Sequence, residues 1–415
     1  MKAEILCVGT ELLLGDIVNT NAAYIAKELA NIGIDVYYQS VVGDNNDRLK
    51  SSLNLAFSRA DIVILTGGLG PTYDDLTKET VAEYFHKEMQ MDEDSLKGIE
   101  CFFKKLDRPM TENNKKQAMM PAGATIFPNA HGTAPGLAVS ENGKTAILLP
   151  GPPSEMKPMF GESVIPYLMG FSNKVLVSHN LRLFGIGESQ VEDTLYGLMK
   201  NSTNPTIAPY AKTGEVTLRV TASGDTYEEC ETLIVPVIKQ IKDALGQYIY
   251  GIDVANLQTA VVQALKEKNL TVATAESCTG GLVSQRITQV PGASEVFGCG
   301  VCSYSNAIKQ AVLHVSGDTL EKYGAVSRQT AAEMAQGVRR ISGADIGVST
   351  TGIAGPGGGS KEKPVGLVYI AIDSEKVSKV IKLNLQRGRV DDRENIRHMS
   401  AQHVFQMILD ALKSY

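Results

Sequence analysis

Residues 270–281 read L-T-V-A-T-A-E-S-C-T-G-G, a short apolar run that passes into a glycine-bearing loop. The run predicts a buried strand, because it is short, contains threonine and valine, and ends at a turn signal. A helical pattern precedes it at residues 257–268, and another follows the glycines. Strands that alternate with helices indicate an α/β domain with a mainly parallel sheet.

The rest of the C-terminal third repeats this pattern. Residues 345–352 form a run that leads into the loop I-A-G-P-G-G-G, and residues 366–373 form a further apolar run. The chain closes with an amphipathic helical pattern from about Asp392 to Leu412. We therefore expect one α/β domain over residues 253–415.

Residues 1–170 predict a second α/β domain. Residues 4–9, 61–66 and 145–150 are short apolar runs, and helical patterns such as residues 21–31 lie between them. Each run ends in a glycine- or proline-rich loop, as strands of a parallel sheet do before a helix.

Residues 171–252 have a different pattern. Two stretches alternate like strands, at residues 173–184 and 214–223, and two amphipathic helical stretches are also present. The predicted fold class is therefore α/β, with two α/β domains of mainly parallel sheets joined by a small α+β domain.

Composition argues against nucleic-acid and membrane partners. The 415 residues carry a net charge of −6 without a dense basic run, whereas nucleic-acid binders present a basic face. No apolar run reaches the roughly 18 residues of a membrane helix. The N-terminus lacks a signal-peptide pattern, and the six cysteines are dispersed, so we expect a cytoplasmic protein. Cys299 and Cys302 form a lone C-x-x-C, interpreted as small residues in a buried strand.

Ser277 lies where the first strand of the C-terminal domain turns into a helix. Ligands of open α/β sheets bind at the carboxyl ends of strands, and a helix start offers unpaired amides that stabilise an oxyanion. Gly280 and Gly281 allow a substrate to approach the backbone closely. A structural alternative is that Ser277 and Thr279 cap the helix.

Lys309 is the candidate base for Ser277. It ends the segment Y-S-N-A-I-K, residues 304–309, which follows the next strand. A lysine removed from water loses its proton near neutral pH and activates a serine, and Tyr304 is placed to relay the proton. The histidines of this domain carry no motif, which favours Ser-Lys over Ser-His-Asp. Two alternatives stay open: Cys278 as the nucleophile, and Lys309 as a surface residue.

Two further features indicate an anion site. The loop of residues 352–359 supplies amides for an anion, and Arg393 and Arg397 share one helix face. A flexible loop and a solvated pair of charges are the structural alternatives.

Four motifs of this domain resemble the nicotinamide-nucleotide amidase family. They are TAESCTGG at 274–281, YSNAIK at 304–309, GAVS at 324–327 and TGIAGPGGGSKEKPVGLV at 351–368. The resemblance covers about residues 257–412 and implies that nicotinamide mononucleotide is converted to nicotinate mononucleotide and ammonia. It implies a catalytic set made of Ser277, Lys309 and Tyr304. The catalytic arginine and threonine of the family correspond to Arg393 and Thr351. The resemblance implies no cofactor for this domain. The expected substrate-binding residues are Thr279, Gly280, Gly281, Gly352, Gly355 and Arg397.

The N-terminal domain carries its own glycine-rich loop, T66-G-G-L-G-P-T-Y-D-D-L-T77. Such a loop wraps phosphate oxygens at a helix start, and Asp74 and Asp75 supply the oxygen ligands that Mg²⁺ prefers. Asp44 is a third candidate ligand. The alternative is that Asp74, Asp75 and Thr77 cap the following helix. The G-K-T at residues 143–145 is interpreted as a hairpin turn, because Ala138 stands where a phosphate-binding loop needs glycine.

These motifs resemble the molybdopterin-binding-like domain of the CinA family, and the whole chain has that family's architecture. Its other motifs are residues 8–21, 43–45, 112–119, 132–136 and 149–156. The resemblance implies a metal-dependent ADP-ribose pyrophosphatase that yields AMP and ribose 5-phosphate. The expected substrate-binding residues are Gly67, Gly68, Gly70, Thr72, Asn19, Asn21 and Gly151, with Mg²⁺ or a similar ion on Asp44, Asp74 and Asp75.

The middle module resembles a KH-like domain, yet F184-G-I-G-E-S has one residue between its glycines, and the RNA-clamping loop needs two. We interpret the module as a spacer or dimer contact and expect a homodimer. Two other functions stay open: a non-catalytic partner of DNA-uptake machinery, and a pterin-binding protein.

Overall fold

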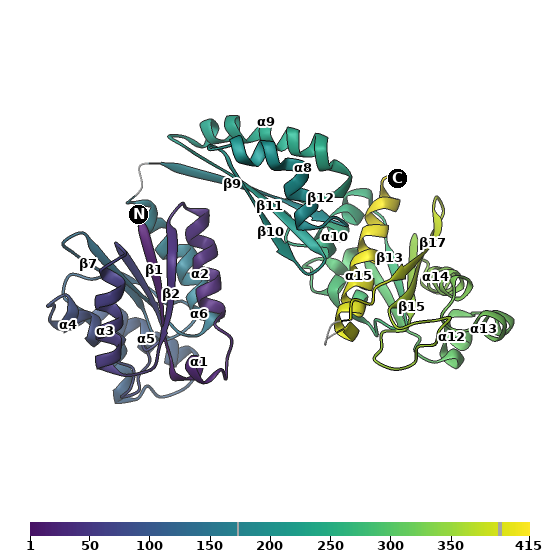
Figure 1. Ribbon diagram of the computed structural model, residues 1–415. Coiled ribbons are helices and arrows are strands. Elements are labelled where there is room, and N and C mark those ends of the chain that lie inside the picture. The colour runs from purple at the N-terminus through teal and green to yellow at the C-terminus, as the bar shows by residue number, and fades with distance from the viewer. Residues whose placement is uncertain (172–173, 389–391) are drawn as a thin grey trace. The chain divides into compact units, whose positions relative to one another are not determined.

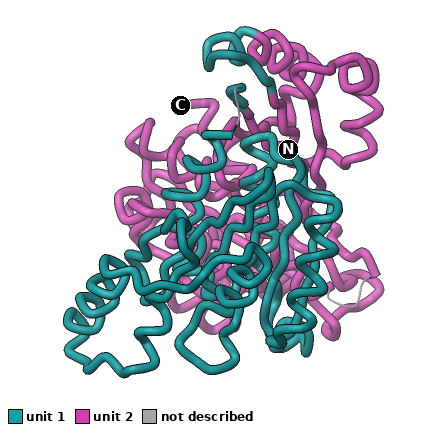
Figure 2. The backbone as a smooth tube through the Cα atoms, turned by 90° about the vertical axis from the view of Figure 1, so that its left-hand side faces the viewer, with its two compact units in different colours: residues 1–177, 222–232 teal, residues 178–221, 233–415 magenta. Residues whose placement is uncertain are grey.

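The computed structural model describes residues 1–171, 174–388 and 392–415. The chain forms two compact units, coloured separately in Figure 2. One comprises Met1–Val177 and Ala222–Thr232, and the other comprises Ser178–Thr221 and Leu233–Tyr415.

The N-terminal domain is a six-stranded sheet in the order β2-β1-β3-β8-β7-β6 (Figure 1). Its first four strands are parallel, whereas β7 and β6 run antiparallel to their neighbours. The strands are β1 Lys2–Val8, β2 Asp35–Val42, β3 Ile62–Thr66, β6 Thr125–Phe127, β7 Gly136–Glu141 and β8 Lys144–Leu149. The other elements are α1 Thr10–Leu14, α2 Thr20–Asn31, α3 Asn46–Phe57, α4 Thr77–Tyr84, β4 Met89–Met91, α5 Glu93–Lys105, η1 Glu112–Ala118, β5 Met119–Pro121, α6 Pro153–Met159, η2 Phe160–Val164 and α7 Ile165–Met169.

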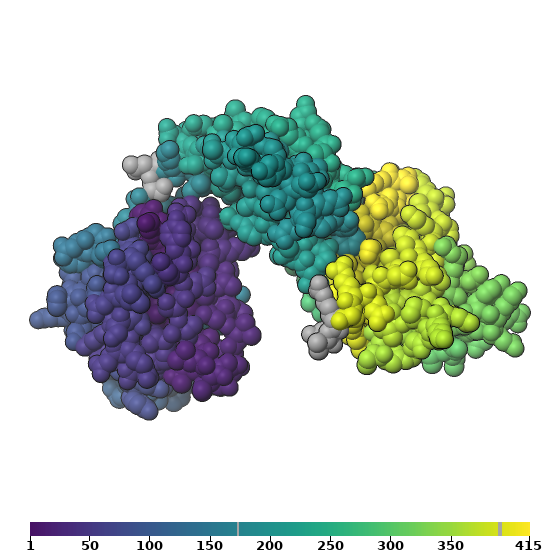
Figure 3. Space-filling model, in the orientation of Figure 1, coloured from purple at the N-terminus to yellow at the C-terminus, as the bar shows by residue number. Residues whose placement is uncertain are grey.

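Helices cover both faces of this sheet, because its central strands are apolar on both sides. Ile62 and Ile64 of β3 belong to a core with α2 and α6, whereas Val63 and Leu65 belong to a core with α3 and α4. Figure 3 shows the outer face of this domain, in purple and blue, as a space-filling surface. The predicted hairpin is confirmed: Asn142 and Gly143 have positive φ and join β7 to β8.

The middle module is a four-stranded sheet in the order β10-β11-β9-β12 with two helices. Its elements are β9 Val175–Phe184, α8 Glu188–Asn201, β10 Thr206–Lys212, β11 Glu215–Gly224, α9 Tyr227–Leu245, η3 Gly246–Tyr248 and β12 Ile249–Ile252. Both predicted strands and both predicted helices are present. Sequence reasoning missed β10 and β12, which form the two edges of the sheet. A proline at position 209 masks the strand pattern of β10, and edge strands tolerate proline.

The C-terminal domain is a five-stranded sheet in the order β14-β13-β15-β16-β17 (Figure 1). β14, β13 and β15 are parallel, and β16 and β17 continue the sheet in antiparallel fashion. The strands are β13 Val272–Glu276, β14 Phe297–Cys302, β15 Ile346–Gly352, β16 Leu367–Ser374 and β17 Ser378–Asn384. The helices are α10 Leu257–Lys268, α11 Leu282–Thr288, η4 Ala293–Glu295, α12 Asn306–Leu313, α13 Gly317–Tyr323, α14 Arg328–Ser342 and α15 Asp392–Leu412.

This sheet also separates two cores. Val272 and Val348 pack with α10, α11 and α15 on one face, and Ala273 and Ala275 pack with α12, α13 and α14 on the other. The expectation of a buried strand at Cys299 and Cys302 is wrong: β14 is an edge strand whose residues alternate between exposed and half-buried. Among the described residues, no helix is long and apolar enough to span a membrane.

Candidate active sites

Ser277 directly follows β13 and is held there by the backbone. Its amide donates to the Thr350 carbonyl at 3.0 Å, which continues the pairing of β13 with β15. The buried Glu276 carboxylate accepts hydrogen bonds from the amides of Val283 at 3.0 Å and Ser284 at 2.8 Å at the start of α11. A carboxylate at a helix N-terminus is stabilising, so Glu276 fixes the bend that presents Ser277.

The capping alternative for Ser277 and Thr279 is wrong. α11 begins after Gly281. Amides of its first turn donate to the Glu276 carboxylate, not to the side chain of Ser277 or Thr279. The Thr279 hydroxyl instead lies 2.7 Å from the Thr350 hydroxyl. Because Ser277 has no capping role, its hydroxyl is available for chemistry.

Lys309 is wholly buried, with 0% of its surface exposed, so the surface alternative is wrong. It lies on α12, which follows β14 at the same edge of the sheet as Ser277. Its Nζ lies 3.1 Å from Ser277 Oγ, 2.6 Å from the Ser303 carbonyl and 3.3 Å from the Tyr304 carbonyl. Ser277 itself is 9% exposed, so solvent reaches the pair from the serine side.

Burial lowers the pKa of Lys309. A neutral amine has two N–H groups and one lone pair. The two carbonyls accept hydrogen bonds from Lys309 Nζ, and the Ser277 hydroxyl lies within hydrogen-bond distance of the same nitrogen. Burial raises the pKa of the neighbouring Cys278 thiol to about 12, which keeps it protonated and argues against Cys278 as the nucleophile.

One cavity of about 200 Å³ brings the five predicted catalytic residues together; they are Ser277, Lys309, Tyr304, Thr351 and Arg393. Thr351 donates to the Ala325 carbonyl at 2.6 Å, and Arg393 donates to the Gly355 carbonyl. Both contacts fix loops that form the walls of the cavity. Ala325 and Val326 also line it, and the GAVS motif is the sequence signal that marks them.

Tyr304 has a different position from the one expected. Its side chain is 68% exposed at the mouth of the cavity, and among the described residues its hydroxyl has no hydrogen bond. Its carbonyl oxygen, not its phenol, contacts Lys309. Within the described part of the chain, the phenol therefore makes no hydrogen bond to Lys309 or Ser277 through which it could relay a proton.

Of the predicted substrate-binding residues in this domain, only Gly352 lines the cavity. Arg397 donates to the Thr279 carbonyl at 2.9 Å and lies 3.4 Å from Glu394, so it supports the loop after Ser277. Gly280 and Gly281 have φ values of +61° and +92°, which explains why glycine stands there. These residues support the loop after Ser277 and do not line the cavity themselves.

Fewer backbone amides are available for an oxyanion than the sequence indicated. The Gly280 amide is committed to the Ser277 carbonyl at 3.1 Å. The amides of Cys278 and Thr279 donate to no carbonyl within the described part of the chain. These two amides, which directly follow Ser277 in the chain, are the candidate donors for an oxyanion beside it.

The N-terminal domain has a larger cleft of about 600 Å³ at the carboxyl ends of its parallel strands. All the residues predicted for this domain line it; they are Asn19, Asn21, Asp44, Gly67, Gly68, Gly70, Thr72, Asp74, Asp75 and Gly151. The sequence prediction therefore identified one contiguous cleft from four separate segments of the chain.

Asn21 and the glycine-rich loop build the floor of this cleft. Asn21 Nδ2 donates to Thr66 Oγ1 at 2.9 Å and to the Gly151 carbonyl at 2.7 Å, joining the ends of β3 and β8. Its buried Oδ1 has no partner among the described residues. A Cβ on Gly67 would lie 2.0 Å from the Val8 carbonyl, so only glycine allows this approach.

The predicted metal ligands share the cleft without converging. Asp44 accepts hydrogen bonds from the Thr10 amide and hydroxyl at 2.9 and 2.8 Å, and Asp75 accepts from the Thr72 amide at 2.9 Å. No group of three or more acidic, histidine or cysteine residues suited to a metal ion is found within the described ranges. The helix-capping alternative is also wrong, because α4 has no side-chain cap.

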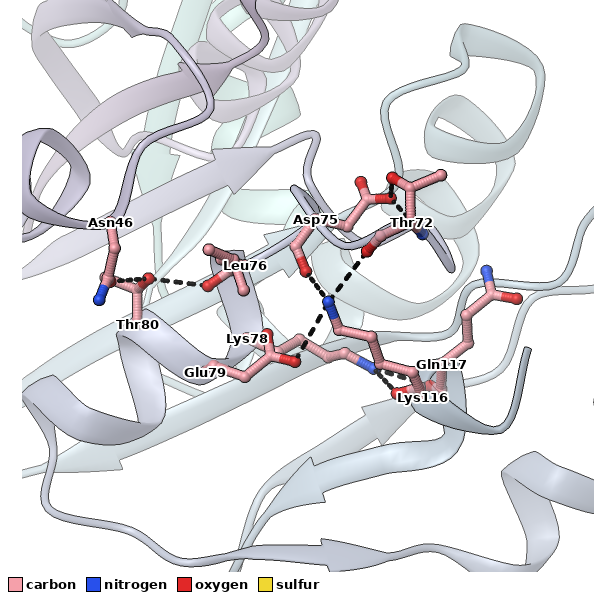
Figure 4. A network of polar contacts seen from close by, with 9 residues as sticks. All are labelled: Asn46, Thr72, Asp75, Leu76, Lys78, Glu79, Thr80, Lys116 and Gln117. Atoms are coloured by element: carbon pink, nitrogen blue, oxygen red, sulfur yellow. Dashed lines mark hydrogen bonds and ion pairs between the residues drawn. The ribbon is translucent and has the colours of Figure 1, made fainter. Parts of the chain in front are cut away.

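Two lysines that sequence reasoning did not select lie beside the loop of residues 72–75: Lys116 contacts the loop, and Lys78 contacts the segment that carries Lys116 (Figure 4). Lys116 Nζ donates to the Thr72 carbonyl at 3.1 Å and to the Asp75 carbonyl, and the buried Lys78 donates to the Gln117 carbonyl at 2.8 Å. Burial lowers the pKa of Lys78 to about 8. The E-N-N-K-K-Q motif carries Lys116, but nothing in its pattern shows what that lysine contacts.

Comparison with known proteins follows the same division of the chain. Residues 4–170 match a "Probable molybdopterin binding domain", residues 178–251 match a "Damage-inducible protein CinA KH domain", and residues 254–412 match a "CinA C-terminal domain". The class defined by fold and sites is thus a protein of two α/β domains, each with a cleft, and a KH-like module.

Relatives of nearly equal length show the family. A "Putative competence-damage inducible protein" of Clostridium novyi (strain NT) is 56% identical over 96% of this chain and 95% of its own. A "CinA-like protein" of Dictyoglomus thermophilum is 53% identical over 94% of this chain and 95% of its own. A crystal structure of a competence/damage inducible protein from Agrobacterium tumefaciens is 40% identical, covering 38% of this chain and 93% of its own, with a TM-score of 0.36. The chain belongs to the CinA family.

Proposed function

We propose that the C-terminal domain hydrolyses the carboxamide of nicotinamide mononucleotide and releases ammonia. The observation that carries this proposal is the 3.1 Å contact between Ser277 Oγ and a fully buried Lys309 Nζ. No acidic side chain forms an ion pair with Lys309 among the described residues. An uncharged buried amine beside a serine at a strand end is the arrangement that acyl transfer needs.

The residues suggest the following steps. Lys309 takes the proton of Ser277 as Oγ attacks the carboxamide carbon, and the amides of Cys278 and Thr279 stabilise the oxyanion. Lys309 then delivers that proton to the leaving nitrogen, and ammonia departs. Water, deprotonated by Lys309, hydrolyses the ester on Ser277 and yields nicotinate mononucleotide. Arg393, which lines the cavity, supplies the positive charge for the 5′-phosphate.

A comparison of two serine variants tests this proposal. Ser277→Ala should abolish ammonia release from nicotinamide mononucleotide, because it removes the nucleophile. Ser342→Ala is the matched control, because Ser342 belongs to the same domain, donates to the Val338 and Arg339 carbonyls of its own helix, and does not line the cavity. Undiminished ammonia release by Ser277→Ala would refute the assignment.

We further propose that the N-terminal domain cleaves the pyrophosphate of ADP-ribose to AMP and ribose 5-phosphate. The support is a roughly 600 Å³ cleft at the carboxyl ends of parallel strands, lined by a glycine-rich loop and by Asn21. Clefts at this position of an α/β sheet bind nucleotides. Glycine-rich loops bring backbone amides close to phosphate oxygens.

A divalent cation belongs to this second proposal. Asp44, Asp74 and Asp75 do not form a three-residue metal group within the described ranges, and Mg²⁺ is commonly held by one or two carboxylates together with substrate phosphates. The ion would neutralise charge on the pyrophosphate. EDTA should therefore stop ADP-ribose cleavage while ammonia release continues. Equal loss of both activities, or of neither, would contradict this division.

A further inference from the structure

Glu155 is an acidic residue of the N-terminal cleft that is neither a predicted metal ligand nor part of the glycine-rich loop. It lies in the first turn of α6, directly after the P-G-P-P loop that follows β8. Its side chain lines the same cleft as Asp74, Asp75 and the glycine-rich loop. It is half-buried, so its carboxyl group is shielded from bulk water but reachable from the cleft.

Asn129 holds this carboxyl group in one orientation. Asn129 Nδ2 donates to Glu155 Oε2 at 2.7 Å and to the Ala134 carbonyl at 2.9 Å. Its Oδ1 accepts the His131 amide at 3.0 Å, so every polar group of the Asn129 side chain is used. The amide cannot turn without losing these bonds, and Glu155 is therefore positioned as a base needs to be.

Gly132 closes over the same group. A Cβ at Gly132 would lie 2.0 Å from Glu155 Oε2 and 2.2 Å from its Cδ, so any larger residue would displace the carboxyl group. This gives a physical reason for the glycine that opens the G-T-A-P-G segment at residues 132–136. Two segments of the chain thus meet to fix one carboxyl group in the cleft.

We infer that Glu155 is the general base that activates the water for pyrophosphate hydrolysis in the N-terminal cleft. This inference rests on the proposed ADP-ribose cleavage. Glu155 takes one proton from water as the water oxygen forms a bond to a phosphorus atom. The P–O bond to the bridging oxygen breaks, and the second phosphate leaves with that electron pair. The proton on Glu155 then passes to solvent, which leaves AMP and ribose 5-phosphate.

Two effects of opposite sign act on the Glu155 pKa. Burial raises it, whereas the hydrogen bond from Asn129 and the charge of His131 lower it. A carboxylate whose pKa is raised towards the working pH is a stronger base. Four other acidic residues line the cleft: Glu11, Asp44, Asp74 and Asp75. These four residues are assigned to binding. Substituting them should therefore change KM and the metal dependence more than it changes the acid limb of the pH profile.

The test is the pH profile of ADP-ribose hydrolysis by the full-length chain. Glu155→Gln should lower kcat by about 100-fold or more and remove the acid limb of the profile, with KM nearly unchanged. Asn129→Ala should move the acid limb to higher pH, because it removes a contact that lowers the Glu155 pKa. Glu162→Gln is the matched control: Glu162 is exposed, lies one helical segment further on, and does not line the cleft.

The outcomes separate the two claims. If the wild-type chain does not cleave ADP-ribose, the proposed function fails and this inference fails with it. If the wild type is active and Glu155→Gln keeps more than about one tenth of its kcat, or keeps the acid limb, only the inference is overturned. Circular dichroism and a thermal unfolding transition equal to that of the wild type report that each variant is folded.

Discussion

Replacing Lys309 with methionine tests the Ser–Lys assignment most directly. Methionine keeps most of the apolar stem, which is fully buried, and removes the Nζ that lies 3.1 Å from Ser277 Oγ. The variant therefore loses the base while the core around α12 keeps its volume. We expect ammonia release to fall far more than stability does.

The size of both effects can be worked from the contacts. Loss of a general base costs roughly 10²- to 10⁴-fold in rate, or about 3–5 kcal/mol of transition-state stabilisation. The buried Ser303 carbonyl loses a donor, at about 1–3 kcal/mol for a buried unsatisfied group, whereas the Tyr304 carbonyl belongs to an exposed residue. Burial destabilises the charged form of the Lys309 amine, so removing the amine offsets part of this loss of stability. The net change in the free energy of unfolding should stay within about 2 kcal/mol.

The assay is continuous measurement of ammonia released from nicotinamide mononucleotide, with calorimetry to follow unfolding. Lys266→Met is the control, since Lys266 is a half-buried lysine of the same domain that pairs with Glu295 at 2.7 Å, far in sequence from Lys309. Lys309→Arg is a second probe, because arginine stays charged and cannot act as a base. More than about one tenth of wild-type activity in either Lys309 variant would refute the reasoning.

Three more predictions follow from the same contacts. The kcat/KM for ammonia release should rise with pH through the pKa of Lys309, which burial lowers from 10.5, because only the neutral amine accepts the serine proton. Arg397→Ala should lower kcat about 10- to 100-fold with little change in stability, because Arg397 supports the loop after Ser277 through the Thr279 carbonyl. Glu215→Ala should destabilise the C-terminal unit by about 3 kcal/mol, because Glu215 accepts from Gln402 at 2.6 Å in a buried network that also holds Arg286.

Each of these has its own measurement and contrary result. A pH profile that falls from pH 6 to pH 9 would contradict a neutral Lys309. Arg397→Lys keeps the charge but not the guanidinium geometry, so it serves as the control for charge alone. Full activity in Arg397→Ala would exclude a supporting role. For Glu215→Ala, calorimetry should show a lower transition for the unit that contains Gln402; an unchanged transition would mean that the network adds no stability.

The sequence by itself determined the fold class and both groups of chemical residues. Short apolar runs that end in glycine-rich loops predict parallel strands, because the carboxyl ends of such strands face a common cleft. The structure places Ser277 and Lys309 in contact, and it places Asn21, Asp44 and Gly67 in one cleft. These successes depend on local pattern, which the chain carries residue by residue.

Tertiary structure alone decided which partner each side chain meets. Arg397 and Glu155 show this: the first supports a loop instead of lining the cavity, and the second lines a cleft because Asn129 and Gly132 meet it from a distant segment. Both edge strands of the middle module were missed for a related reason. A strand is an edge strand because it has no neighbouring strand on one side, and a hydrogen-bond partner can lie far away in the sequence. A local run of residues contains neither kind of information.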